Sequence, residues 1–257
     1  MTEGVELSLT EEDRGPSRGR LMLLFWLAAA ASVVLPLVPY GRNVLYPFAL
    51  LGTWAHEMGH GLVALLLGGS FERLEIYRNL GGVAFHSGVG SFGRVLVSAG
   101  GLIGPAVPGA LVIVYGSRPR TARWVLAVLS VAVALSVVFF VRNLFGVIAL
   151  AVIAAVAAVF GFRSPGGFRL GLTQLLGIQL CLASWGTLDY MFTRDFVRDG
   201  QRVDSDTQNI AEVLFLPYWF WGGVTAALSL AILAWAFYLA WLRSERRSAL
   251  APPTLPT

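Results

Sequence analysis

The sequence has no lysine, only one cysteine and few charged residues of either sign. Of its 257 residues 13% are charged, and all 19 basic side chains are arginine, against 15 acidic ones. The resulting charge of +4 is scattered between apolar runs, so the sequence has no basic stripe of the kind that binds nucleic acid. The single thiol, Cys181, excludes an intramolecular disulfide bond and a metal cage built from several cysteines.

Hydrophobic residues make up most of what remains. They account for 56% of the chain, and the mean hydropathy is +0.69, far above that of a soluble domain of this length. Because a membrane span needs about 20 apolar residues, we predict an all-α polytopic membrane protein with about six to seven transmembrane helices. The predicted spans cover residues 21–39, 46–67, 95–115, 122–141, 144–162, 170–188 and 216–242.

Both ends of the chain are polar. Residues 1–20 carry acidic side chains ahead of arginines, whereas a secretory signal begins with a short basic region, so we predict that the first apolar run is a retained span. We expect a polar tail over 1–20, one transmembrane domain over 21–242 and a disordered tail over 243–257. We expect a multi-pass integral protein of the plasma membrane.

The interval after the second predicted span lacks a helical pattern. Apolar residues partly alternate with polar ones from Phe71 to Phe85, on both sides of the turn signal Asn79-Leu80-Gly81-Gly82, which predicts a small β-hairpin. Such backbone is tolerated at membrane depth only where its hydrogen bonds are made within the protein or toward a wet cavity. A hairpin here therefore indicates a function, although an ordinary solvent-exposed loop also fits the pattern.

The second predicted span contains the string His56-Glu57-Met58-Gly59-His60. Positions i and i+4 of a helix share a face, so the two imidazoles point to one place, with Glu57 beside them. Two neutral imidazoles can hold a zinc ion, and a carboxylate can take a proton from a water molecule that the metal polarises. We therefore predict a zinc site with Glu57 as general base, against the alternative that these polar residues hold helices together.

A zinc site with two histidines needs a third protein ligand. Asp189 ends the sixth predicted span and is the only carboxylate between Glu75 and Asp195. Four crossings after the second span return the chain to the side of the histidine motif, so we favour Asp189. Asp206 is the alternative, although helix capping by Ser205 or Asp206 is a sufficient role without a metal. Three further rivals follow the motif, namely Glu72, Glu75 and His86.

The zinc string within a span, the hairpin and a late aspartate together resemble the site-2 protease family of intramembrane zinc metalloproteases, and in particular its small peptidase M-fifty B-like branch. The resemblance extends from about Leu51 to Ser229, and better-known members have Leu-Asp-Gly where this chain has Leu188-Asp189-Tyr190. It implies proteolysis of membrane-embedded substrates, with one Zn²⁺ per chain on two histidines and a late aspartate. The other shared strings are Ala99-Gly100-Gly101-Leu102-Ile103-Gly104-Pro105, Val141-Arg142-Asn143-Leu144-Phe145-Gly146, and Ser205-Asp206 ahead of Leu216-Pro217-Tyr218-Trp219.

The expected partners are the lipid bilayer and a membrane-protein or peptide substrate. We expect the substrate to unwind and to pair as an extended strand with the hairpin. The candidate substrate-binding residues are Gly81, Gly82, Val83 and Asn143, of which Asn143 is either a polar substrate partner or a helix break. The rival function is a non-proteolytic metal-binding scaffold or transporter, but a transporter needs further metal ligands along several spans, and the apolar runs contain almost none.

Overall fold

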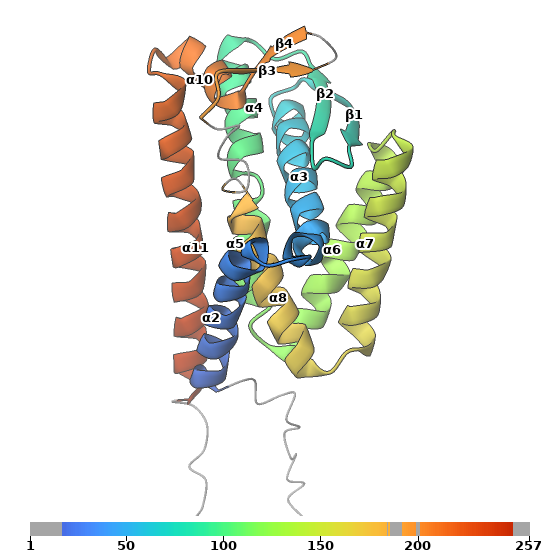
Figure 1. The fold of residues 1–257 in the computed structure, drawn as a ribbon, viewed down its shortest axis with the longest axis vertical. Helices are drawn as coiled ribbons and strands as arrows, with labels where there is room; N and C mark the ends of the chain where they lie inside the picture. Colours follow the sequence, from blue (N-terminus) through green and yellow to red (C-terminus); the bar gives the residue numbers. More distant parts are fainter. Residues whose placement is uncertain (1–16, 184, 186–191, 199–200, 249–257) are drawn as a thin grey trace, which may run out of the picture.

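A computed structural model describes residues 17–183, 185, 192–198 and 201–248. It is largely helical, with two short hairpins (Figure 1), and the predicted all-α class with a hairpin insert is confirmed. The helices are α2 (Arg18–Val34), η1 (Leu35–Leu37), α3 (Gly41–Leu66), α4 (Ser91–Ile103), α5 (Ala106–Tyr115), α6 (Pro119–Phe139), α7 (Leu144–Arg163), α8 (Gly166–Cys181), α10 (Asp206–Leu214) and α11 (Tyr218–Ser248). The strands are β1 (Ser70–Ile76), β2 (Gly82–Ser87), β3 (Asp195–Arg198) and β4 (Gln201–Asp204).

The long apolar helices are typical of a protein that crosses a membrane several times. Among the described residues, 4 helices are long and apolar enough to cross, and the bent pair α4 and α5 raises this number to 5 if it forms one span. Two further predicted spans coincide with α3, which carries the histidine motif, and α8, which has 16 residues. Neither belongs to that set. The 4 helices are Gly19–Leu37, Pro119–Phe139, Leu144–Arg163 and Tyr218–Arg243.

The span predicted over 95–115 is divided into two helices. α4 and α5 are bent by 41° at the short break between them. Pro105 stands at the N-cap of α5, and proline has no N–H to continue the hydrogen-bond ladder of a preceding helix. The bend therefore follows from the sequence at this position, although the apolar run itself is continuous.

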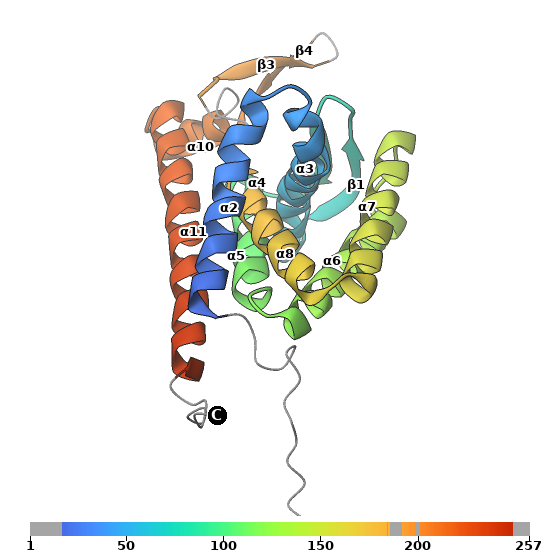
Figure 2. The ribbon, with the colours of Figure 1, turned by 60° about the horizontal axis from the view of Figure 1, so that its bottom comes forward.

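The elements that surround the histidine motif gather at one end of the molecule. Figure 1 places the first residues of α2 and the last residues of α11 at one end, and both hairpins with α10 at the other. In Figures 1 and 2, α6 and α7 lie side by side and away from α11. α3 contacts α4, α8, β1 and β2, so the helix that carries the motif is enclosed by both helices and strands.

The first hairpin is packed into the protein and is not a solvent loop. β1 and β2 pair in antiparallel register, and the N–H of Tyr77 donates to the carbonyl of Gly81 to close the turn. Leu74 and Ile76 are fully buried (0% exposed) in the core formed with the helices. Their burial supplies the hydrophobic free energy that fixes the hairpin on the bundle. The sequence alternative of an ordinary surface loop is therefore wrong.

The outer edge of β1 is occupied by the segment between α6 and α7. The Leu74 N–H donates to the Phe140 carbonyl at 2.9 Å, and the Arg142 N–H donates to the Leu74 carbonyl at 3.0 Å. A parallel bridge joins Leu74 to Val141. Among the described residues, the other edge of β2 has no paired strand. The hairpin therefore offers one free strand edge.

The second hairpin, β3 with β4, is a feature that we did not predict. Its strands pair in antiparallel register from Asp195 with Asp204 to Arg198 with Gln201. The sequence contains a signal for it, because Asp199-Gly200 separates two short runs with valine and phenylalanine, and Asp-Gly favours a two-residue hairpin turn.

Candidate metal centre

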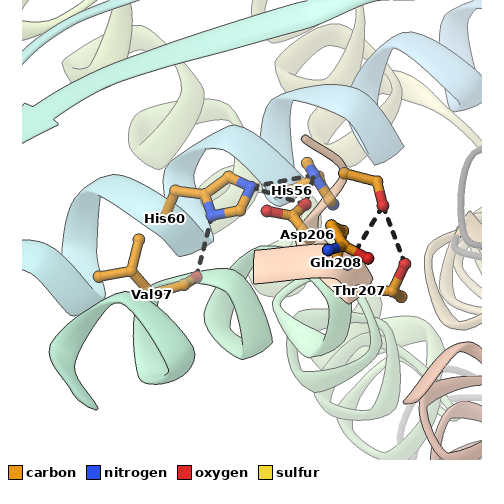
Figure 3. Close-up of polar contacts among 7 residues, drawn as sticks. His56, His60, Val97, Asp206, Thr207 and Gln208 are labelled. Atoms are coloured by element: carbon orange, nitrogen blue, oxygen red, sulfur yellow. Dashed lines mark hydrogen bonds and ion pairs between the residues drawn. The ribbon is translucent and has the colours of Figure 1, made fainter. Parts of the chain in front are cut away.

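α3 brings the two histidines of the motif together. His56 and His60 lie one turn apart on the helix, and their Nε2 atoms are 3.1 Å apart (Figure 3). The Nδ1 atom of His60 lies 2.9 Å from the backbone carbonyl of Val97 in α4. A carbonyl can only accept, so this contact assigns the proton to Nδ1 and leaves a lone pair on Nε2. α4 thus fixes the orientation of the His60 ring, with the lone pair of Nε2 toward His56 and Asp206.

Close packing of α4 against α3 makes this orientation possible. A Cβ atom on Gly59 would collide with the backbone of Gly100, and one on Gly101 would collide with the ring of His60. Glycine at these positions lets the two helices approach closely. Gly59 therefore serves the packing of α3 against α4.

Asp206 approaches the same point from α10. Its Oδ2 atom lies 3.2 Å from Nε2 of His56 and 3.3 Å from Nε2 of His60 (Figure 3). Ser205 is the N-cap of α10, and its hydroxyl accepts from the N–H of Gln208 at 3.2 Å. Because Ser205 makes the capping bond, the carboxylate of Asp206 is left for the imidazoles. The sequence could have indicated this, because Ser205 suffices as the N-cap and so the capping role does not explain Asp206.

The three donor atoms fit a zinc ion. In a tetrahedral site with bonds of about 2.0–2.2 Å, ligand atoms lie about 3.3–3.6 Å apart, close to the 3.1, 3.2 and 3.3 Å between Nε2 of His56, Nε2 of His60 and Oδ2 of Asp206. The lone pair on Nε2 of His60 faces Oδ2 of Asp206. Two acceptor atoms this close need a cation or a proton between them. Within the described part of the chain, these three residues form the one group with this arrangement.

The electrostatics favour an ionised aspartate. Burial alone would raise the pKa of Asp206, but when the imidazoles carry a proton toward the carboxylate, the charge of His60 and the hydrogen bonds from both rings hold that pKa well below its usual range. The side chain is almost fully buried. A carboxylate that stays charged in a buried position is suited to a divalent cation.

The other carboxylates proposed as third ligand lie elsewhere or are not described. Asp189 lies outside the described residues. Glu75 accepts from Tyr77 at 2.6 Å and pairs with Arg73 at 3.1 Å, and these partners lower its pKa, with Tyr77 contributing most. Glu72 accepts from the hydroxyl of Ser87 at 3.3 Å.

Glu57 is buried at the rim of the histidine pair, under β2. Its side chain is 7% exposed. A Cβ atom on Gly82 would lie 2.8 Å from the Oε1 atom of Glu57 and 2.8 Å from Cγ2 of Thr53. The hydroxyl of Thr53 donates to the carbonyl of Leu80 at 2.8 Å, which ties the hairpin turn to α3. β2 therefore passes directly over the carboxylate, and only glycine fits at the crossing.

A cavity of about 630 Å³ connects these groups. Its walls include His56, Glu57 and His60 of the motif, and Asp206. Of the predicted substrate-binding residues, Gly81, Gly82 and Val83 line it, whereas Asn143 is not among its lining residues. Phe196 in β3 and Val203 in β4 cover part of it, and sequence reasoning missed both because it did not find the second hairpin.

Asn143 lies behind the hairpin, on the outer edge of β1. Its Oδ1 atom accepts from the N–H of Ile76 at 3.0 Å, and its Nδ2 group donates to the carbonyl of Ile76 at 2.6 Å. The side-chain amide thus makes the two hydrogen bonds that the backbone of a neighbouring strand would make with Ile76. The side chain thus continues the pairing that Phe140 and Arg142 begin.

Comparisons with known proteins place the chain in a family. The family described as Peptidase M50B-like matches residues 24–236, which include both helices of the metal centre and the hairpin between them. No curated protein and no solved structure matches the chain. With its apolar helices, the match identifies an integral membrane protein of a peptidase family. The chain belongs to the Peptidase M50B-like family.

Proposed function

We propose that the protein is an intramembrane zinc metalloprotease that hydrolyses peptide bonds of membrane-embedded substrates. The observation that carries the proposal is the meeting of three ligand atoms from His56, His60 and Asp206 beside a buried Glu57 in one cavity. The same cavity is bordered by a free strand edge, which suits an extended peptide. Family membership supports the same reaction class.

In this proposal His56, His60 and Asp206 would hold one Zn²⁺. When bound there, the ion would supply Lewis acidity and lower the pKa of a water molecule. Val97 holds the ring of His60 by its carbonyl, so the ligand keeps the right tautomer. The favoured sequence candidate, Asp189, lies outside the described residues, and we propose Asp206 in its place because of its distances to both imidazoles.

Glu57 acts as general base and then as general acid. It takes a proton from the water molecule while the water oxygen forms a bond to the carbonyl carbon of the substrate. When the C–N bond breaks, Glu57 returns this proton to the leaving amine nitrogen, so the enzyme is restored. The close approach of Gly82 to the carboxylate limits the room in which Glu57 can move.

The substrate binds as a strand along β2. The outer edge of β1 is already paired with the segment before α7, so an added strand can pair only with β2, whose residues Gly82 and Val83 line the cavity. Strand addition supplies backbone hydrogen bonds without a fixed sequence. Gly81 lies in the turn at the start of this edge. Asn143 does not contact the substrate in this proposal but holds the outer edge of β1 through Ile76.

The test is cleavage by purified protein with known metal content. We expect about one zinc per chain and cleavage of a model transmembrane substrate by wild type but not by Glu57→Gln. Wild-type protein that holds zinc yet cleaves no substrate, and whose zinc exchanges across liposome membranes, would support the transporter alternative. Within the described residues the metal centre is the single group of this kind, which favours the protease.

A further inference from the structure

All three histidines of the chain lie in one cavity. The sequence has 3 histidines, and His86 lines the same cavity as the two in the motif. His86 belongs to β2, which follows α3 and β1 in the chain. Its ring is 6.2 Å from the ring of His60 between centroids, and the two planes are inclined by only 24°. Neither the metal site nor the general base uses this third imidazole.

The strand register explains how His86 reaches the site. Alternate residues of a strand share a face, so His86 lies on the same face of β2 as Gly82. Gly82 contacts Glu57 at one end of this face, and His86 stacks beside His60 at the other. β2 therefore extends from the general base to a zinc ligand, with an imidazole at its metal end.

His86 is placed near the metal ligands without being one of them. The ligand atoms of His56, His60 and Asp206 lie within 4.8 Å of one another, and His86 is not a member of this group. Its Nδ1 atom is buried and has no hydrogen-bond partner among the described residues. A buried ring nitrogen without a partner costs free energy, so a group that arrives with the substrate is the natural partner for this side chain.

We infer that His86 donates a hydrogen bond to the carbonyl oxygen of the bond being cleaved, as negative charge develops on that oxygen. This inference rests on the proposed proteolytic function. A neutral imidazole has one N–H to donate, and no proton is transferred in this role. Donors fixed at the place where charge develops stabilise the transition state more than the ground state. The strand that carries His86 is the one along which we place the substrate.

Substitutions that distinguish loss of the N–H donor from loss of the aromatic ring test this role. His86→Phe keeps an aromatic ring but removes the donor, and His86→Gln and His86→Asn restore an N–H at two different distances from the backbone. In detergent, with a model transmembrane substrate, we expect His86→Phe to keep about one zinc per chain, to keep KM within about threefold of wild type and to lose kcat by about ten- to a hundredfold, the scale of one lost donor. At least one of the two amide variants should recover part of kcat.

Inhibitor binding gives a second readout that does not depend on turnover. A phosphinic peptide based on the cleaved sequence mimics the tetrahedral transition state, whereas a hydroxamate of the same sequence mainly binds the metal. We expect His86→Phe to lose about ten- to a hundredfold in affinity for the phosphinic peptide and little for the hydroxamate. Equal losses for both inhibitors, or equal losses of kcat in all three variants, would overturn the inference in favour of simple packing.

Other outcomes distinguish a failure of the role of His86 from a failure of the proposed proteolytic function. Loss of zinc from His86→Phe with the fold retained would make His86 a ligand and overturn the proposed role. An inactive wild type with a full zinc site would instead overturn the proposed function itself. Unchanged kcat and unchanged phosphinic affinity in His86→Phe, with an active wild type, would leave the protease standing and remove His86 from its mechanism.

Discussion

Asp206 and Asp189 are the two single residues on which the metal centre can be tested most directly. Asp206 lies at 3.2 and 3.3 Å from the two imidazoles, so Asp206→Asn removes a ligand charge and little volume. We expect zinc affinity to fall on the order of a hundredfold or more, since loss of even an outer-shell partner costs about 10- to 100-fold. Zinc per chain after dialysis against a weak chelator measures this.

Two matched variants serve as controls for that result. Asp204→Asn lies two residues away and also lines the cavity, and it should keep zinc. Asp189→Asn should keep zinc as well. Retention by Asp206→Asn together with loss by Asp189→Asn would make the favoured sequence candidate the ligand and would contradict our assignment.

Glu57 is expected to act on water and not on the metal. Glu57→Gln keeps the shape of a side chain that is 7% exposed but removes the base. We predict zinc content equal to wild type and a loss of turnover by about a hundredfold or more, as for a missing general base. The measurement pairs kcat with metal content on the same sample, and a variant that is folded but lacks zinc would show that the roles are reversed.

At the scale of elements, β2 crosses α3 with Gly82 directly against the side chain of Glu57. A Cβ atom on Gly82 would lie 2.8 Å from the carboxylate oxygen, whereas one on Gly81 would meet only the side chain of Asn79, at 3.1 Å. We predict that Gly82→Ala keeps zinc but lowers kcat by about tenfold or more, because small misplacements of a catalytic group cost about that much. Gly81→Ala, the matched control, should stay near wild type. Similar losses in both variants would mean that the whole turn matters.

The outer edge of β1 depends on one side chain. Asn143→Ala removes two hydrogen bonds to Ile76, at 3.0 and 2.6 Å, and leaves two backbone groups unpaired. We expect a loss of about 1–3 kcal/mol of stability and faster hydrogen exchange in β1. Asn143→Asp keeps the acceptor for the Ile76 N–H but sets a second acceptor against the Ile76 carbonyl, so it should be destabilised at least as much as Asn143→Ala.

This experiment also separates the two roles considered for Asn143. A residue that positions β1 changes both hydrogen exchange and kcat. A residue that binds the substrate raises KM while exchange in β1 stays at the wild-type rate, and that pattern would contradict our placement of Asn143 behind the hairpin.

At the scale of the whole molecule, the proposed zinc ion would join α3 to α10, which lie far apart in the sequence. A ligand that binds only the folded state stabilises it by mass action, by about 2.7 kcal/mol at a hundred times its Kd. Chelation should therefore lower Tm in detergent and speed hydrogen exchange in α10 more than in α6 and α7. Added zinc should reverse both effects. In Asp206→Asn, chelator should change neither Tm nor the exchange rate of α10. If chelation of wild type speeds exchange equally in α10, α6 and α7, the metal does not link α3 to α10.

The sequence by itself determined the elements of this protein whose causes are local. Long apolar runs predict spanning helices because lipid leaves the backbone no other partner than itself. His56 and His60 share a face because a helix repeats every 3.6 residues, so the metal motif is readable without a structure. The alternation of apolar and polar residues around a glycine turn is also a local feature, and it predicted the first hairpin. The second hairpin had an Asp-Gly signal of this kind, at Asp199-Gly200, and was missed.

Only the tertiary structure decided which carboxylate stands opposite those imidazoles among the described residues. Isolation in an apolar run favoured Asp189, and a possible capping role argued against Asp206. Both arguments concern local surroundings. The position of Asp206 depends instead on α10 packing against α4 and on Ser205 taking the cap, and local sequence preferences do not determine which distant helices pack together. The same holds for His86, which reaches the metal centre only because β2 lies across α3.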